Sequence, residues 1–316
     1  MKRKITVCIV GGNYGLKVLL PAILGIKNII LKAIATKNKR IDKDIIYYTS
    51  WKKMIDECGP DLVLIAVPPK LQSNIIKYLI KNNINFLAEK PLTYNFIDAK
   101  KILDKFKKKK INAVVDLNFL KIYSILKYKK LIRKYKYLNS DIKIKWLFKS
   151  NSLKEKKSWK NKHKDGGGLY LNFGFHLISL IIFLFGDIKF LKRCNKKNNV
   201  HYLVGKTKNG NNIQIKLSNN YVGKNIFSIR YKIKKNKYLA LENKSVNYHG
   251  NYIIYYQRSI KKNIIFKQKF QNSEESRINC SKLIITDLIK MFKKKFFIPF
   301  NNLQHGVRVH QIISNI

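Results

Sequence analysis

Acidic residues are scarce in this chain of 316 residues. Only 17 Asp and Glu stand against 66 Lys and Arg, which gives a formal net charge of +49. Such an excess favours a nucleic-acid or membrane-surface partner. The lysines are spread along the whole chain with many Ile, Asn and Tyr, whose codons are rich in A and T, so genome composition is the competing explanation. No basic helix-turn-helix, zinc spacing or aromatic RNA-binding strand accompanies the charge, which argues against a specific nucleic-acid partner.

Cysteine is also rare, and its spacing excludes a metal-binding motif. The four residues are Cys8, Cys58, Cys194 and Cys280, and none lies within metal-ligand spacing of another. We therefore expect reduced structural thiols, as in a cytosolic protein, and no metal site.

Long apolar runs are missing as well. The most apolar stretch, residues 177–186, has about half the length that a bilayer-spanning helix needs. The first twelve residues superficially resemble a signal peptide, but their apolar run is short, flows into a glycine turn and precedes no cleavage site. These features predict a cytoplasmic protein without a membrane partner.

Apolar strands alternate with amphipathic helices over the first third of the chain. This alternation predicts a doubly wound parallel sheet, and we place this Rossmann domain at residues 1–118. The strands are expected at 4–10, 29–35, 61–67, 85–88 and 112–116, and the helices up to about 26, after Ser50, over 70–82 and over 94–108.

The pattern changes after residue 118, and we assign residues 119–316 to a second α/β domain. Short alternating segments separated by polar turns fill residues 188–270, which predicts an open, mostly antiparallel sheet. Flanking elements are expected as a strand at 141–149 and as helices at 121–136, 276–294 and 301–315, with an apolar helix after the glycines at 166–168.

The first strand ends in a glycine-rich turn formed by Gly11, Gly12, Asn13, Tyr14 and Gly15. A strand-to-helix turn of this kind points backbone N–H groups and the helix dipole at a pyrophosphate. Asn13 stands where a glycine is usual, and Asn tolerates the left-handed region better than most residues. The turn is thus a candidate dinucleotide site, and a plain tight turn is the alternative.

Two further strand ends are candidates for cofactor contacts. The second strand ends in Thr36 and Lys37, where many NAD-binding folds carry an acid that holds the ribose. A hydroxyl and a cation suit the extra phosphate of NADP, so NADP is slightly favoured over NAD, although Lys37 is also explained as one more lysine. Val67 and Pro68 end the third long strand and turn the chain across the cofactor edge.

Glu89, Lys90 and Pro91 follow the strand at 85–88, at the sheet edge where ligands bind in doubly wound folds. A lysine held there can stabilise developing negative charge on a reacting oxygen. An exposed lysine without a role is the alternative.

The segment after the three glycines carries Asn172 and His176, four residues apart and therefore on one face of a helix, with Ser179 nearby. An imidazole that titrates near neutrality can take a proton from a carbinol while hydride leaves its carbon. A hydrogen-bonded core histidine is the alternative.

Taken together, these motifs resemble the Gfo/Idh/MocA family of NAD(P)-dependent oxidoreductases. The resemblance also includes residues 20–23 (LPAI), the segment Asp116 to Phe119, Trp159 and the closing residues 305–316. It implies an N-terminal Rossmann domain and a C-terminal domain whose open sheet forms oligomer interfaces. It also implies a catalytic group that corresponds here to Lys90, Asn172 and His176, acting on sugars, sugar nucleotides, inositols or related cyclic polyols.

Several positions depart from the family pattern. Asn172 replaces an Asp, so His176 lacks a negative neighbour that would favour its charged form. The other departures are Asn13 for Gly, Gln72 for His, Leu120 for Arg and Ser179 for a second Asp.

The sequence thus predicts a cytoplasmic, homo-oligomeric dehydrogenase or reductase that uses NAD or NADP on a CH–OH group. A cofactor-binding protein of the same fold with weakened catalysis, in a sensor or assembly role, is the first alternative. A nucleic-acid-binding protein, suggested only by the charge, is the second.

Overall fold

The structure, a computed structural model, describes residues 4–37, 42–135, 139–155, 158–245, 249–268, 272–293 and 297–316. It divides into two compact units. Unit 1 comprises Met1–Asn118, Lys162–Gly167 and Arg277–His310, and unit 2 comprises Phe119–Asn161, Gly168–Ser276 and Gln311–Ile316. The sequence analysis expected two continuous domains at 1–118 and 119–316. The two units are discontinuous, since residues 277–310 pack with the N-terminal sheet. The boundary after residue 118 stays a prediction.

Unit 1 is built on a parallel sheet with strand order β3-β2-β1-β4-β5-β6 in its described residues. The continuous apolar sequence of the inner strands suits a sheet that is covered on both faces. Its strands are β1 (Ile5–Val10), β2 (Ile29–Ala35), β3 (Tyr47–Tyr48), β4 (Leu62–Ile65), β5 (Asn85–Glu89) and β6 (Ala113–Asp116). The sequence did not predict the short β3.

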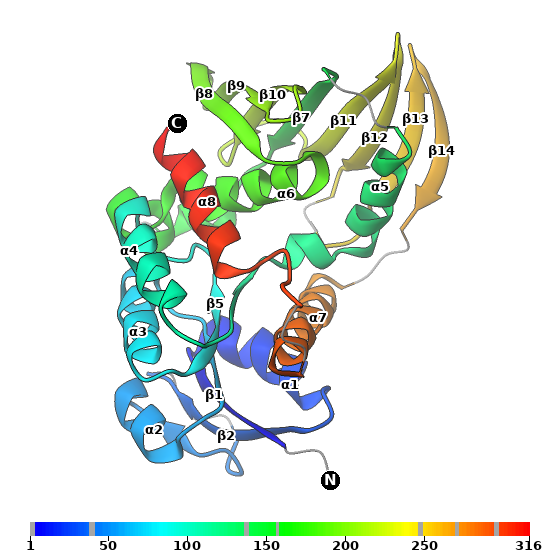
Figure 1. Ribbon diagram of the computed structural model, residues 1–316. Helices are drawn as coiled ribbons and strands as arrows, with labels where there is room; N and C mark the ends of the chain where they lie inside the picture. Colours follow the sequence, from blue (N-terminus) through cyan, green and yellow to red (C-terminus); the bar gives the residue numbers. More distant parts are fainter. Residues whose placement is uncertain are drawn as a thin grey trace. The chain divides into compact units, whose positions relative to one another are not determined.

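Helices cover both faces of this sheet. On one side lie α1 (Leu20–Leu24) and α7 (Ser273–Lys293), and on the other lie α2 (Trp51–Cys58), α3 (Pro69–Lys81) and α4 (Phe96–Lys107) (Figure 1). Side chains cap two of them: Ser50 accepts from the Lys53 N–H, and Asn95 accepts from the Asp98 N–H. The predicted doubly wound α/β fold is confirmed.

The helix expected up to residue 26 differs in its winding. A π-helical turn at Gly15–Leu19 precedes α1. Pro21 has no N–H with which to bond a carbonyl one turn earlier, so the regular α pattern is interrupted at this point.

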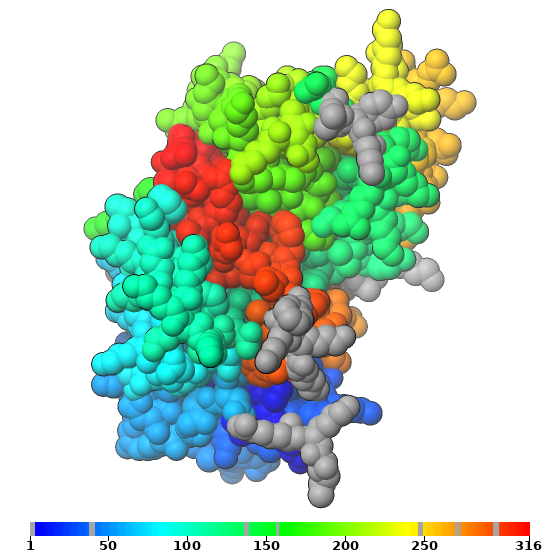
Figure 2. Space-filling view, in the orientation of Figure 1, coloured from blue at the N-terminus to red at the C-terminus, as the bar shows by residue number. Residues whose placement is uncertain are grey.

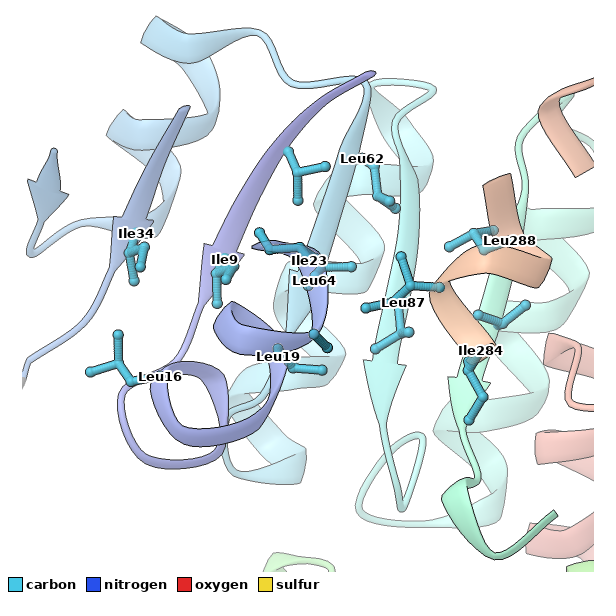
Figure 3. Close-up of a cluster of buried hydrophobic side chains, with 14 residues drawn as sticks. Ile9, Leu16, Leu19, Ile23, Ile34, Leu62, Leu64, Leu87, Ile284 and Leu288 are labelled. Atoms are coloured by element: carbon cyan, nitrogen blue, oxygen red, sulfur yellow. The ribbon is translucent and has the colours of Figure 1, made fainter. Parts of the chain in front are cut away.

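Apolar side chains of β1, β4 and β5 form the core of unit 1 together with α1 and α7 (Figure 3). Ile9, Leu64 and Leu87 come from the strands, while Ile284 and Leu288 come from α7 and are fully buried against them. This packing explains why α7, close to the C-terminus in sequence, belongs to the N-terminal unit.

The segment before α8 (Leu303–Ser314) covers the outer edge of β6. The Val115 N–H donates to the Asn301 carbonyl at 2.8 Å, and the Asn301 amide donates back to the Val115 carbonyl at 2.9 Å. The first turns of α8, in red, reach the surface beside α4 (Figure 2). His310 links this helix to the segment after β5, because its Nε2 accepts a hydrogen bond from the Thr93 N–H at 3.2 Å.

Unit 2 contains a second sheet with order β14-β13-β12-β11-β7-β10-β9-β8 in the described residues. Neighbouring strands are antiparallel except for β7 and β10, which pair in parallel, so the expected mostly antiparallel sheet is confirmed. Its strands are β7 (Asp141–Leu147), β8 (Ile188–Lys197), β9 (Val200–Thr207), β10 (Asn212–Ser218), β11 (Ile226–Lys234), β12 (Lys237–Asn243), β13 (Ile253–Arg258) and β14 (Lys261–Lys267).

Two helices of unit 2, α5 (Tyr123–Arg133) and α6 (Phe175–Phe185), bury apolar side chains. From α5, the Tyr128 hydroxyl donates to the Leu239 carbonyl of β12 at 3.0 Å. From α6, Phe185 contacts Tyr231 of β11, with ring centroids 5.3 Å apart. The polar-out, apolar-in alternation of β7 fits a sheet that is covered on one face.

The packing of α7 can be tested by truncating one buried side chain. Ile284→Ala is expected to lower the free energy of unfolding by about 2–5 kcal/mol, because it leaves a cavity in the core. Leu283→Ala, at a neighbouring position that is 49% exposed, is the matched control and should change it by less than about 0.5 kcal/mol. Denaturant unfolding measures both, and equal effects would refute the assigned packing.

His310 predicts a specific loss of stability in acid. Burial lowers the pKa of His310 from 6.5 to about 3, so the folded state holds the neutral imidazole. The contribution of neutral His310 to the free energy of unfolding is fully present above pH 6.5 and falls as the pH drops from there towards 3. Between pH 6.5 and 4.5 the wild type should lose about 2 kcal/mol more than His310→Gln, which keeps an acceptor for the Thr93 N–H.

The measurement is denaturant unfolding at both pH values. His163→Gln, at an exposed position, is the control and should follow the wild type. Equal losses of unfolding free energy in the wild type and in His310→Gln would contradict the lowered pKa of His310.

Candidate functional site

The carboxyl ends of β1, β4 and β5 meet at one edge of the unit 1 sheet. Val10 lies opposite Ile65, and Ile65 lies opposite Ala88. The glycine turn, residues 67–68 and residues 89–90 follow directly, so the register brings these predicted segments to the same edge. This is where ligands bind in doubly wound folds.

Gly11 occupies a position that admits only glycine. Its φ is +137°, and a Cβ there would stand 2.2 Å from the carbonyl oxygen of Ala66. Helical structure begins at Asn13, which is exposed, while Gly12 is half-buried. Asn13 is not among the described residues with positive φ, so its tolerance of the left-handed region is not used here.

The other predicted cofactor positions lie at the ends of β2 and β4. Thr36 is buried and its N–H donates to the Tyr48 carbonyl, whereas Lys37 is exposed. Val67 is half-buried and Pro68 is exposed, just before α3. Exposed groups therefore border the glycine turn.

A buried amide holds the segment that carries Lys90. The Nε2 of Gln72 donates to the carbonyls of Glu89 at 2.6 Å, Pro91 at 2.9 Å and Leu92 at 3.1 Å. Gln72 thus fixes the backbone on both sides of Lys90, which is itself half-buried. The sequence showed Gln72 only as a departure from the family pattern.

A polar cluster lies inside unit 1 behind the glycine turn. The Tyr14 hydroxyl donates to Asp116 Oδ2 at 3.1 Å, and the Ser281 hydroxyl donates to the same oxygen at 2.9 Å. The Asn118 amide donates to the Tyr14 oxygen at 3.1 Å. Tyr14, predicted as part of the cofactor turn, thus directs its hydroxyl to Asp116, and its cofactor contact stays a prediction.

Glu89 and Asp116 are neighbours across β5 and β6. Burial, followed by the charge of Asp116, raises the pKa of Glu89 well above its usual value. Burial also raises the pKa of Asp116, while hydrogen bonds from Ser281, Glu89 and Tyr14 act in the opposite direction. Burial raises the pKa of Tyr14 further above 10, so its phenol stays protonated.

In unit 2, Asn172 and His176 lie in one continuous helical segment, as the sequence predicted. Asn172 belongs to a π-helical stretch, Leu169–Gly174, which leads into α6 at Phe175. Both side chains are buried, and so is Ser179. The sequence placed Asn172 and His176 on one face because residues four apart align in an α-helix. The π-helical winding around Asn172 changes that alignment.

His176 lies against an aromatic side chain. Its ring stacks on Phe119, with centroids 4.6 Å apart and planes at 21°. Phe119 also contacts Trp146, Phe227 and His249. The imidazole is therefore held in a fixed plane in a largely apolar setting.

The glycine triplet includes one position of close packing within unit 1. Gly166 has φ +88°, and a Cβ there would come within 2.7 Å of Pro69. Asp165 pairs with Lys70 at 3.3 Å. Residues 162–167 are thus fixed at the start of α3, next to Val67 and Pro68.

Unit 1 therefore gathers the glycine turn, residues 67–68, Glu89 and Lys90, while unit 2 holds Asn172 and His176 in one segment. Sequence reasoning did not propose Asp116 or Ser281 as site residues. The signals for Asp116 were an acid at the end of a strand and its place in the segment Asp116 to Phe119 that resembles the family, whereas Ser281 carries no motif.

Residues 5–117 match the model of the oxidoreductase family with an NAD-binding Rossmann fold, Gfo/Idh/MocA. The match covers less than half of the chain, and over these residues the chain resembles the NAD-binding domain of this family. The match ends where the structure passes from β6 to the second sheet, so the family's NAD-binding domain coincides with the N-terminal part of unit 1.

Two relatives come from Schizosaccharomyces pombe. The uncharacterized oxidoreductase C115.03 is 26% identical over 144 residues, and the uncharacterized oxidoreductase C26H5.09c is 27% identical over 139 residues. These matches cover 45% and 44% of this chain, and 39% and 37% of the relatives. The chain thus matches less than half of the length of either relative.

Solved structures share the fold over nearly the whole chain. A levoglucosan dehydrogenase in complex with NADH and levoglucosan has a TM-score of 0.81 at 15% identity, covering 99% of this chain and 96% of the other. An inositol dehydrogenase homolog from Azotobacter vinelandii, with NADH and myo-inositol, has a TM-score of 0.77 at 12% identity, covering 100% and 95%. At this identity the similarity establishes the fold.

The described residues contain neither a cluster of metal ligands nor a helix that could span a membrane. No group of three or more His, Cys, Asp or Glu side chains there could hold a metal ion. Among the helices that the structure describes, none has the length and apolar character to cross a membrane.

The contact at Gly11 gives a direct test of the turn. Gly11→Ala is expected to lower the free energy of unfolding by about 3 kcal/mol or more, because its Cβ would overlap the Ala66 carbonyl. Gly59→Ala is the matched control: its φ is also positive, but no atom lies within 4 Å, so only the backbone cost of about 1–2 kcal/mol remains. Thermal and denaturant unfolding compare the two, and equal losses would contradict the close approach.

Proposed function

We propose that this protein is an NAD(P)-dependent oxidoreductase. It transfers hydride between a nicotinamide cofactor and the carbinol or carbonyl carbon of a sugar, a sugar nucleotide or a cyclic polyol. The observation that carries the proposal is the shared edge of β1, β4 and β5, where the glycine turn and Lys90 meet inside a family NAD-binding domain. The complexes of related folds with NADH and levoglucosan or myo-inositol support the class of substrate.

The residues at this edge fit a dinucleotide. The backbone N–H groups at Gly12 and Asn13 open a helix, and they would receive the pyrophosphate. Thr36 and Lys37 follow the strand that reaches the ribose in this fold, and Lys37 would pair with the additional phosphate of NADP. Val67, Pro68 and Glu89 would border the rest of the cofactor. A bound nicotinamide would supply or accept the hydride.

The side chains of this chain would handle the proton and the charge. Lys90 would stabilise negative charge on the substrate oxygen, with its backbone held by Gln72. His176 would exchange the hydroxyl proton, with its ring plane set by the stack on Phe119. Asn172 would orient His176 and, being neutral, would not stabilise an imidazolium as a carboxylate would.

Two further candidates remain. A cofactor-binding protein with weakened catalysis is favoured by Asn172 and Ser179, which stand where the family carries acids. Its cofactor would bind, but turnover would be slow for every substrate. A nucleic-acid-binding role is supported only by the net charge of +49. We also retain homo-oligomerisation through the open sheet, whose edge strand β14 exposes Ile264 and Ile265.

Removing either of the two central side chains should separate binding from chemistry. Lys90→Met and His176→Asn are each expected to lower kcat by at least 100-fold, roughly the contribution of a positioned acid–base or charge-stabilising group. Cofactor affinity should stay within about threefold of the wild type in His176→Asn, because the dinucleotide residues belong to unit 1. The measurements are fluorescence titration with NADH and NADPH, and turnover on a panel of polyols, sugars and sugar nucleotides.

Lys81→Met and His163→Gln, at exposed positions, are the control variants and should behave as the wild type. Cofactor binding without turnover on any member of the panel would favour the weakened cofactor-binding protein. If neither NADH nor NADPH binds the wild type, the oxidoreductase proposal is wrong.

A further inference from the structure

This acid-poor chain places two of its 17 acidic residues side by side in the interior of unit 1. Glu89 and Asp116 occupy partner positions on the adjacent parallel strands β5 and β6. Adjacent strands lie about 4.8 Å apart, so two side chains in register on one face are in contact range. Asp116 is fully buried and Glu89 is half-buried.

Two carboxylates in such a place cannot both be ionised at neutral pH, because burial and mutual repulsion favour a shared proton. The hydrogen bonds show which partner keeps the charge. Asp116 Oδ2 accepts from both the Tyr14 and Ser281 hydroxyls, so the anion is stabilised on Asp116. The pKa of Glu89 is the more strongly raised of the two, which places the shared proton mainly on Glu89.

The ammonium of Lys90 is the cation of this group. The backbone N–H of Lys90 donates to Glu89 Oε2 at 3.1 Å, which fixes the start of the Lys90 segment on the carboxyl pair. The charge of Lys90 acts on both carboxyls and lowers the pKa of each. The two carboxyls share one negative charge and the Lys90 ammonium carries one positive charge, so the group at the sheet edge is neutral as a whole.

Each element packed against the pair contributes identified groups. The glycine turn contributes Tyr14, the end of β5 contributes Lys90, the residue after Leu117 contributes the neutral Asn118, and α7 contributes the non-titrating Ser281. Lys90 is a cation whose charge acts on Asp116. Ser281 of α7, the two carboxyls and Lys90 all belong to unit 1.

We propose that Glu89 and Asp116 form a proton-sharing pair that acts as one anion and holds the Lys90 ammonium, charged and oriented, at the sheet edge. Glu89 and Asp116 thus act as positioning residues for Lys90. This role in catalysis rests on the oxidoreductase function proposed above. The pair keeps one negative charge as long as either carboxyl remains, because loss of one partner removes the repulsion that kept the other protonated.

This property predicts a non-additive response. In Asp116→Asn, the titration midpoint of Glu89 should fall by at least about one pH unit, because its charged neighbour is gone. Each single variant, Asp116→Asn or Glu89→Gln, should leave the titration midpoint of Lys90 near that of the wild type. The double variant removes the whole anion and should lower the Lys90 midpoint by at least about one pH unit.

Both midpoints can be measured without cofactor or substrate. The chain has six glutamates, so carbon-13 labelling of glutamate gives a sparse carboxyl spectrum in which Glu89 is assigned by its loss in Glu89→Gln. The Lys90 midpoint comes from the pH dependence of acetylation by acetic anhydride, resolved by mass spectrometry of the Lys90 peptide. Ser281→Ala removes one hydrogen bond and no charge, so it is the matched control and should leave the Lys90 midpoint unchanged.

The proposal is overturned if Glu89 titrates equally in the wild type and in Asp116→Asn. It is also overturned if the double variant leaves the Lys90 midpoint unchanged, or if either single variant shifts it as far as the double variant does. Titration of the same samples with NADH and NADPH tests the proposed function separately. Failure of both cofactors to bind, with the predicted titrations, would reject the oxidoreductase reading and retain the pair, whereas binding of either cofactor with unchanged titrations would do the reverse.

Discussion

The close contact between Gly11 and the Ala66 carbonyl is the constraint on which the candidate site depends. It lets the chain leave β1 directly beside the end of β4, with no side chain between the two backbones. The same alignment continues through β4 to β5 and β6, so four successive strand ends share one edge. The glycine turn, residues 67–68, Lys90 and Asp116 are neighbours because of this register, although up to 105 residues separate them in sequence.

Behind this edge, polar groups replace part of the apolar core. Tyr14, Asp116 and Ser281 come from the glycine turn, a strand end and α7, and they meet at one carboxylate oxygen. Leaving such a buried oxygen without donors would cost the desolvation of a charged group. The apolar packing of Ile284 and Leu288 therefore does more than stabilise the fold, because it also holds Ser281 at Asp116. In this way the C-terminal segment contributes to the chemistry of the N-terminal sheet.

Periodic patterns and glycine positions were sufficient to predict much of the fold. The long strands and the helices at 70–82 and 94–108 lie within a few residues of the expected positions, since continuous apolar runs and helical stripes reflect burial directly. The two-residue β3 was missed because two residues carry no periodicity. The π-helical turn before α1 and the one around Asn172 were missed as well, because helix winding depends on hydrogen bonds that composition does not encode. The place of α7 could not be predicted either, since an amphipathic helix does not reveal which sheet it covers.

By itself, the sequence determined the class of the fold and the resemblance of its N-terminal part to an NAD-binding family, and it predicted the candidate site residues. Each of these depends on local order: a glycine turn after a strand, a lysine at a strand end, an amide and a histidine in one helical segment. The tertiary structure alone decided the environment of those residues. Gln72 grips the Lys90 segment, Phe119 stacks on His176, and Glu89 lies beside Asp116 because strand register and helix packing join residues that are distant along the chain. The physical reason is that charge and hydrogen bonding act through space, over a few ångströms, whereas the sequence specifies neighbours only along the backbone.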